Sequence, residues 1–397
     1  MKRKYSYFIV FALALALLMG CATNVKSVEP STSVVAEAKT YDSFTSQVSQ
    51  IQKYGNLTLT LESAKLKDAG YEHGDLVAVK LGDTELSVPL CTDYSDVNVG
   101  ELVLRDKDGA LVLAINMGDF ATTYIGAKKT TNPDKTFVWD LPEGMKLEDI
   151  TLTLSMGEKD GYRAEYLIHQ LERTNNREDY ASDVIFANAR VINGGKLGAN
   201  ALYRSSSPIN NELNRAKYSD AFIKEQGVRC VMNLADSPEN IQGYIAKEDF
   251  ASPYYKALFD EGLVKALNLG VDFKAEDFKK GLKEGLVFFS SHEGPYLVHC
   301  TEGKDRAGFV SALLSALMGV SHDEIVKDYM ETYKNYYHLE EGSEQYNAVK
   351  NSNIETILSL IANGNADLQK GAEAYVKALG LTDSELASLK TNLAKNY

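Results

Sequence analysis

Cysteine is scarce in this chain of 397 residues, which contains only Cys21, Cys91, Cys230 and Cys300. So small a number excludes a scaffold held together by disulfides, and the fold must depend on a hydrophobic core. Histidine is also rare, and the six histidines are scattered without the spacing of metal ligands. We therefore predict neither a metal centre nor a cofactor.

Basic residues are outnumbered by acidic ones. The chain has 42 lysines and arginines against 55 aspartates and glutamates, which gives a formal net charge of −13. A surface of this sign repels polyanions, so nucleic acid is not an expected partner. Any site that binds phosphate must be a local positive spot in a negative field.

Long apolar segments are absent except near the N-terminus. Three basic residues at positions 2–4 precede an apolar run at residues 8–19, which is too short to span a bilayer comfortably. The run ends in Gly20-Cys21, which resembles a bacterial lipobox. The resemblance implies a signal peptide at residues 1–20 and a lipid on Cys21. We therefore expect an exported protein whose N-terminal lipid anchors it to a membrane of the bacterial cell envelope.

The chain beyond this leader divides by its pattern into a tether and two domains. Residues 21–47 are rich in Ser, Thr, Val and Ala, and we expect them to form a surface tether. Residues 48–158 alternate apolar and polar positions between frequent turn residues and show no helical period, which predicts a β-rich accessory domain, a small antiparallel all-β barrel or sandwich. Its expected strands cover residues 57–61, 76–80, 101–104 and 111–115.

Residues 159–397 show a different pattern. Strand-like residues 230–234 and 297–299 alternate with helical stretches, which predicts an α/β fold with helices on both faces of a sheet. The C-terminal part is expected to be helical, because Ser321 and Thr382 each begin a capping box.

The most informative segment links a short strand to a helix. An apolar run at residues 295–298 predicts a buried strand, and residues 309–318 predict a helix. The polar loop between them holds Cys300 and Arg306, with glycines at 303 and 308. Such a loop can direct successive backbone N–H groups at one point, where the N-terminus of the helix adds its positive dipole end.

This combination of residues suits a tetrahedral phosphate dianion. The same field stabilises a thiolate at Cys300, which is the nucleophile we predict. The planar guanidinium of Arg306 can hold two phosphate oxygens. The phosphate-binding residues predicted from the loop are Thr301, Glu302, Gly303, Lys304, Asp305 and Arg306. We expect His299 to orient the loop and to support the thiolate through hydrogen bonds rather than to act as a base.

The loop resembles the H-C-x-x-G-K-D-R-x-G signature of bacterial tyrosine-phosphatase-like enzymes, an atypical group related to dual-specificity and phosphoinositide phosphatases. The resemblance covers roughly residues 165–340, with further matching stretches at residues 188–191, 194–195, 202–208 and 227–237. It implies a cysteine-phosphatase fold and a phosphocysteine intermediate. The family usually has Ser or Thr after the arginine, where this chain has Ala307, which puts the speed of turnover in doubt.

The resemblance also indicates two candidates for the general acid. The K-D-R form of the family suggests Asp305, inside the loop. Related phosphatases carry a mobile acid loop at about the place of Asp272, and both candidates stay open. Lys304 could contact a second phosphate or could pair with Glu302. Arg204 and Asp236 also lie in family-like stretches, and we expect them to form a buried ion pair, with a similar structural role for Arg190.

The β-rich domain is similar in part to the β-barrel domain of S-adenosylmethionine hydroxide adenosyltransferases. The matching pieces are residues 54–57, 94–101 and 113–121. The catalytic companion domain of that family has no counterpart in this sequence. The resemblance therefore implies a fold and no adenosyl chemistry.

Three functions remain open from the sequence. The first is a protein tyrosine or dual-specificity phosphatase, whose partner is a phosphorylated protein. The second is a phosphatase for inositol phosphates or another small phosphorylated metabolite. The third is a lipoprotein that binds phosphate groups without turnover, which Ala307 keeps in consideration. The tyrosines at 329, 333, 336 and 337 could either pack in the core or cover the phosphate site.

Overall fold

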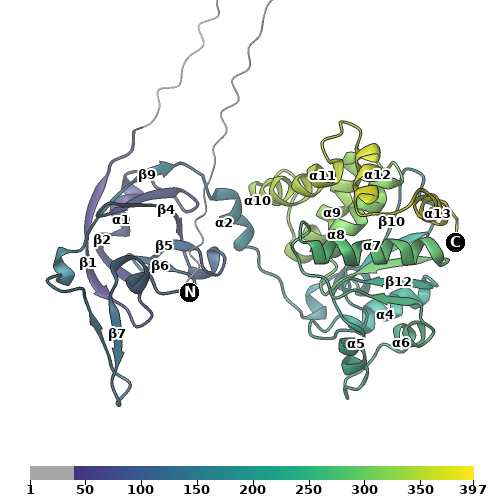
Figure 1. Cartoon of the computed structure of the whole chain (residues 1–397), viewed down its shortest axis with the longest axis horizontal. Coiled ribbons are helices and arrows are strands. Elements are labelled where there is room, and N and C mark those ends of the chain that lie inside the picture. The colour runs from purple at the N-terminus through teal and green to yellow at the C-terminus, as the bar shows by residue number, and fades with distance from the viewer. Residues whose placement is uncertain (1–39) are drawn as a thin grey trace, which may run out of the picture. The chain divides into compact units, whose positions relative to one another are not determined.

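The computed structural model describes residues 40–397 (Figure 1). The expected signal peptide, Cys21 and the larger part of the expected tether lie outside these residues. Within the described residues, no helix is both long enough and apolar enough to cross a bilayer. The β-rich domain and the α/β domain are described separately below.

Seven strands of the first domain form a closed barrel in the order β1-β2-β6-β5-β4-β3-β9. Their bounds are β1 Phe44–Ile51, β2 Leu57–Glu62, β3 Leu76–Leu81, β4 Thr84–Cys91, β5 Leu102–Lys107, β6 Ala110–Ile115 and β9 Thr151–Glu158. Burial alternates along the strands, as expected where one face of a sheet lines the interior of a barrel. In β2, Leu57, Leu59 and Leu61 are buried, whereas the residues between them are more exposed. A two-stranded ribbon, β7 Lys128–Thr131 with β8 Phe137–Asp140, projects from the barrel.

The barrel agrees with the predicted architecture and differs in three details. Strand β1 begins at Phe44, so residues 44–47 belong to a strand although the sequence analysis assigns them to the tether. Strands β4 and β5 pair in parallel, while the other neighbouring strands of the barrel are antiparallel. A short helix, α1 Ser63–Asp68, follows β2 in a region where no helical period was expected.

The α/β domain is built on a five-stranded sheet in the order β10-β11-β14-β12-β13. The strands are β10 Arg190–Ile192, β11 Leu202–Ser205, β12 Cys230–Asn233, β13 Val264–Ala266 and β14 Tyr296–His299. Only β10 is antiparallel to its neighbour. Strand β14 lies at the centre and pairs in parallel with both β11 and β12. The carboxyl ends of these strands therefore meet at one edge of the sheet.

Helices cover both faces of this sheet, as the sequence predicts. Along β14, Tyr296 and Val298 belong to the core on one face, whereas Leu297 belongs to the core on the other. The first face is covered by α7 Glu276–Ser291, α8 Asp305–Leu317 and the C-terminal helices. The second face is covered by α4 Ala216–Glu225, α5 Pro238–Ile245 and α6 Pro253–Asp260. Both faces are buried, which is why the strands read as continuous apolar runs.

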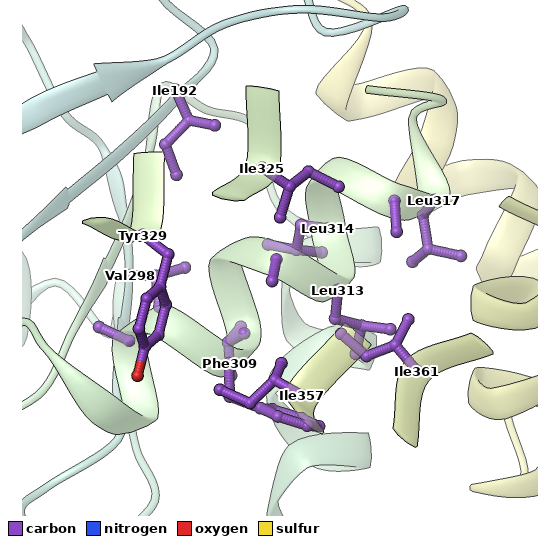
Figure 2. Close-up of a cluster of buried hydrophobic side chains, with 14 of the residues drawn as sticks. Ile192, Val298, Phe309, Leu313, Leu314, Leu317, Ile325, Tyr329, Ile357 and Ile361 are labelled. Atoms are coloured by element: carbon purple, nitrogen blue, oxygen red, sulfur yellow. The ribbon is translucent and has the colours of Figure 1, made fainter. Parts of the chain in front are cut away.

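The C-terminal part is helical. It contains α9 His322–Tyr337, α10 Glu344–Val349, α11 Glu355–Ala362, α12 Leu368–Ala378 and α13 Asp383–Leu393. The predicted capping boxes are present, with Ser321 paired to Glu324 and Thr382 paired to Glu385. Figure 2 shows the core that fixes α8, where apolar side chains of α9 and α11 pack around it. Two short helices, α2 Arg163–His169 and α3 Asp183–Phe186, precede β10.

Candidate active site

The candidate site begins where the central strand ends. Strand β14 ends at His299, Cys300 follows directly, and α8 begins at Asp305. Eleven residues of α8, from Ala307 to Leu317, are buried, so packing fixes the direction of the helix and of the loop before it. The strand–loop–helix arrangement predicted from the sequence is therefore present, with the helix N-terminus at the loop.

Neighbouring elements bind the backbone carbonyls of the loop from outside. Each carbonyl from residue 301 to residue 304 accepts a hydrogen bond: Thr301 from the N–H of Ser207 at 3.1 Å, Glu302 from the hydroxyl of Tyr336 at 2.7 Å, and Gly303 and Lys304 from Nη2 of Arg204 at 2.8 and 3.1 Å. In a trans peptide the N–H points opposite to the preceding carbonyl. The N–H groups of residues 302–305 are thereby directed to the other side, which is the geometry of an anion-binding nest.

The two glycines of the motif are required by close contacts. Gly303 has a φ of 69°, and a Cβ atom there would lie 2.4 Å from the carbonyl oxygen of Ser205. A Cβ atom at Gly308 would lie 2.6 Å from the ring of Tyr329. Gly303 therefore allows the loop to approach β11, and Gly308 allows α8 to approach α9.

Arg204 holds the loop as part of a buried ion cluster. Its Nη1 lies 2.6 Å from Oδ2 of Asp328, and Nε of Arg190 lies 2.7 Å from Oδ1 of the same carboxylate. The expected Arg204–Asp236 pair is wrong. Asp236 instead accepts hydrogen bonds from Asn233 within its own turn and from Tyr244. The sequence could not identify the partner, because Asp328 is 124 residues away on α9.

Cys300 and His299 are both buried at the base of the loop. The Nε2 atom of His299 lies 3.3 Å from the hydroxyl of Tyr255. Burial lowers the pKa of His299 to about 3, and the charge of Arg306 acts in the same direction. The imidazole is therefore neutral at physiological pH, which fits a role in orienting the loop.

Arg306 connects the loop to the segment between β13 and α7. Its Nη1 donates to the carbonyl of Leu269 at 2.9 Å, and its Nη2 donates to Oγ1 of Thr301 at 3.3 Å. These contacts hold the guanidinium between the loop and the segment before α7. They also fix one end of the segment that carries Asp272.

The two acid candidates line the same open depression. The side chain of Asp305 is 45% exposed, and burial of part of the carboxyl raises its pKa above the usual range. Asp272 is exposed and accepts a hydrogen bond from the N–H of Lys274 at 2.9 Å. A raised pKa favours a proton donor, so the electrostatics favour Asp305.

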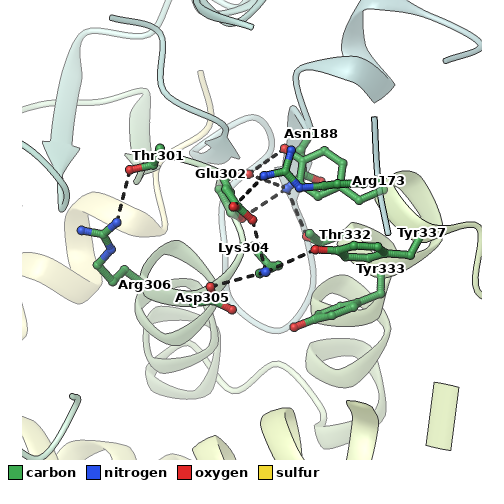
Figure 3. Close-up of polar contacts among 12 residues, drawn as sticks. Arg173, Asn188, Thr301, Glu302, Lys304, Asp305, Arg306, Thr332, Tyr333 and Tyr337 are labelled. Atoms are coloured by element: carbon green, nitrogen blue, oxygen red, sulfur yellow. Dashed lines mark hydrogen bonds and ion pairs between the residues drawn. The ribbon is translucent and has the colours of Figure 1, made fainter. Parts of the chain in front are cut away.

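Glu302 and Lys304 turn toward one another (Figure 3). The carboxylate of Glu302 lies 3.2 Å from Nζ of Lys304 and 2.6 Å from Nη2 of Arg173. Lys304 also donates to the hydroxyl of Tyr337 at 3.3 Å. The Glu302–Lys304 pair, one of the two alternatives predicted for Lys304, is thus present. Arg173, like Asp328, was not among the residues singled out from the sequence.

The tyrosines of α9 serve mainly as core residues. Tyr329, Tyr333 and Tyr336 are buried, and only Tyr337 among the four is partly exposed. Stacked rings connect Tyr329 to Tyr333 and Tyr333 to Tyr337.

Ala307 is fully buried at the start of α8. Among residues 40–397, no group of three potential metal ligands is close enough to hold an ion.

Comparison with known proteins agrees with this geometry. The Tyrosine phosphatase family matches residues 186–395, which is more than half of the chain. The protein therefore belongs to the tyrosine phosphatase family. Residues 46–130 match the SAM hydroxide adenosyltransferase C-terminal domain, which covers much of the barrel.

Two individual relatives match limited parts of the chain. A protein of Cupriavidus necator, provisionally named a tyrosine-protein phosphatase, is 53% identical over 36 residues, which is 9% of this chain and 13% of that relative. The crystal structure of an uncharacterized conserved protein from Thermotoga maritima is 19% identical, covers 31% of this chain and 41% of its own, and has a TM-score of 0.23. Family membership therefore rests on the family match.

Proposed function

We propose that the α/β domain is a cysteine-dependent phosphomonoester hydrolase that acts on phosphotyrosine, or on phosphotyrosine together with phosphoserine and phosphothreonine, in proteins. The observation that carries the proposal is the loop after β14. Its carbonyls accept hydrogen bonds from neighbouring elements on one side, and its N–H groups point to the opposite side. Such a nest stabilises charge on the equatorial oxygens of a phosphoryl group in transfer.

In the first step, the thiolate of Cys300 attacks phosphorus in line and forms an S–P bond. The P–O bond to the leaving group breaks, and the leaving oxygen takes a proton from the acid, for which Asp305 is the better candidate. Arg306 and the N–H groups of the loop bind the three remaining oxygens.

In the second step, water attacks phosphorus and gives its proton to the ionised acid. The S–P bond breaks, which releases phosphate and restores the thiolate of Cys300. A donor to the departing sulfur accelerates this step, because negative charge returns to the sulfur. The usual donor, a hydroxyl after the arginine, is replaced by Ala307, and the hydroxyl of Thr301, which accepts from Arg306, is the alternative donor.

The depression beside the loop supports a protein substrate over an inositol phosphate. Its walls include the apolar side chains of Val271, Phe273 and Ile357, which suit the ring of a phosphotyrosine. A polyphosphorylated inositol needs several free cations, yet Lys304 is already paired, and the depression is lined by one lysine, Lys274, against the carboxylates of Asp272, Asp305 and Glu355. Charge and shape together favour an aryl monoester.

A substrate panel tests the proposal. We expect the full chain to hydrolyse phosphotyrosine peptides faster than phosphoserine peptides and faster than inositol phosphates, without added metal. Cys300→Ser should abolish turnover and keep inorganic phosphate binding, since the nest is formed by backbone. Phosphate binding without turnover in the wild type would support the non-catalytic alternative, and preferred hydrolysis of inositol phosphates would support a metabolite phosphatase.

We also propose that Cys21 carries a lipid and that the protein is exported to the cell envelope. The support is the resemblance of the leader to a lipobox. Metabolic labelling with a fatty acid should mark the wild type and not Cys21→Ser. Labelling of both proteins, or of neither, would contradict the anchor and leave the proposed activity untouched.

A further inference from the structure

Glu302 lies between two cations on the outer side of the loop. Its Oε1 is 2.6 Å from Arg173 and its Oε2 is 3.2 Å from the ammonium of Lys304. The same ammonium is 3.7 Å from Oδ2 of Asp305 and donates to the hydroxyl of Tyr337 (Figure 3). The Lys304 ammonium is thus nearer to Glu302 than to the acid candidate that follows it in the chain.

We propose, on the basis of the phosphatase activity proposed above, that Glu302 is a positioning residue that draws the Lys304 ammonium from Asp305 and so keeps a proton available on Asp305. An ammonium paired fully with Asp305 would stabilise its carboxylate, which cannot donate a proton. Glu302 competes for that ammonium, and its own charge disfavours a second anion close by. Both effects favour the protonated form of Asp305.

Arg173 makes this arrangement stable. Its guanidinium binds Glu302 and lies 5.3 Å from the ring of Tyr336. Burial raises the pKa of Glu302, but the charges of Lys304 and Arg173 outweigh it, so the pKa is lowered. Glu302 therefore stays ionised. Arg173 also lies before residue 186, where the match to the tyrosine phosphatase family begins, so the cluster extends beyond the family region.

The charges around Asp305 make it sensitive to Glu302. The charged and titratable groups that act on Asp305 are Lys304 and Arg306 beside it in the chain, Glu302 in the loop, Arg204 on β11, and Tyr329 and Tyr333 on α9. Burial raises the pKa of Asp305, the three cations lower it, and Glu302 raises it. Among these groups Glu302 is the one carboxylate that offsets the cations.

The test is the dependence of kcat/KM on pH with phenyl phosphate, because kcat/KM reports the first step, in which the leaving group takes a proton. An acid works while protonated, so activity falls as pH rises through its pKa. Glu302→Gln should move this basic limb to lower pH, and Lys304→Met should move it to higher pH, each by about one pH unit. Glu293→Gln, which removes an exposed carboxylate elsewhere in the domain, should leave the limb in place.

Opposite shifts in the two variants would support the proposal, because a general loss of loop structure would move the basic limbs of both variants in the same direction. Shifts in the same direction, or a limb that neither variant moves, would overturn it, as expected if Asp272 is the acid. Phosphatase activity would persist in that case, whereas an inactive wild type would refute the proposed function instead. If Glu302→Gln does not fold, Lys304→Met alone decides, since the proposal requires its upward shift.

Discussion

Arg204 joins Asp328 on α9 to the loop between β14 and α8: one end of its guanidinium pairs with the carboxylate at 2.6 Å, while its Nη2 donates to the carbonyls of Gly303 and Lys304. The loop is therefore shaped by a side chain that cannot touch the substrate. This contact explains why successive carbonyls of the loop turn away from the anion site. The conformation of the loop therefore depends on the ion cluster of Arg190, Arg204 and Asp328.

Replacement of Asp328 with Asn tests that dependence. Removal of the charge leaves Arg190 and Arg204 buried without a carboxylate, which we expect to cost on the order of 3 kcal/mol of unfolding free energy. Urea denaturation of the full chain measures this cost. Asp323→Asn, on an exposed position of the same helix, should change stability by less than about 0.5 kcal/mol. Equal effects of the two variants would show that the ion cluster contributes little.

Gly303→Ala tests the close approach of the loop to β11. A methyl group at this position meets the carbonyl of Ser205, so we expect the loop to shift and phosphate affinity to fall at least about tenfold, a loss of roughly 1.4 kcal/mol. Gly262→Ala is the matched control, because Gly262 also has a positive φ but has open space around it. It should cost about 1 kcal/mol of stability and leave phosphate affinity unchanged. Isothermal titration with inorganic phosphate separates the two outcomes.

The acid can be identified from leaving groups. Asp305→Asn should lower kcat/KM for phenyl phosphate by about a hundredfold or more and lower kcat/KM for an activated nitrophenyl ester far less, because only the poorer leaving group needs the proton. Asp272→Asn should have a small effect on both esters. The reverse result would assign the acid to Asp272, and unchanged rates in both variants would place it elsewhere.

Ala307 is expected to make breakdown of the phosphocysteine the slow step. The usual hydroxyl donor is absent, and a lost donor to a charged group costs about 1.5–3 kcal/mol, roughly ten- to a hundredfold in rate. Rapid mixing with an aryl phosphate should give a burst of phenol equal to the enzyme present. Ala307→Ser should raise the steady rate and keep the burst. Absence of both effects would mean that Thr301 already supplies the donor.

The sequence by itself determined the local features. The apolar run before Cys300, the two glycines and the helix after Arg306 predicted the strand, the loop and α8, because each depends on neighbouring residues. The capping boxes at Ser321 and Thr382 and the strands of the barrel were predicted for the same reason. The match to the tyrosine phosphatase family agrees with that interpretation.

Only the tertiary structure decided which distant side chains support the loop. Asp328 and Arg173 lie far from Cys300 in the chain, and no local pattern distinguishes them from the other acidic and basic residues. The expected ion pair between Arg204 and Asp236 was wrong, because side chains near the turn after β12 bind Asp236 and Arg204 pairs with Asp328 on α9. Which buried charges pair with one another follows from how the helices and strands pack. A charge removed from water is stabilised by an opposite charge close to it.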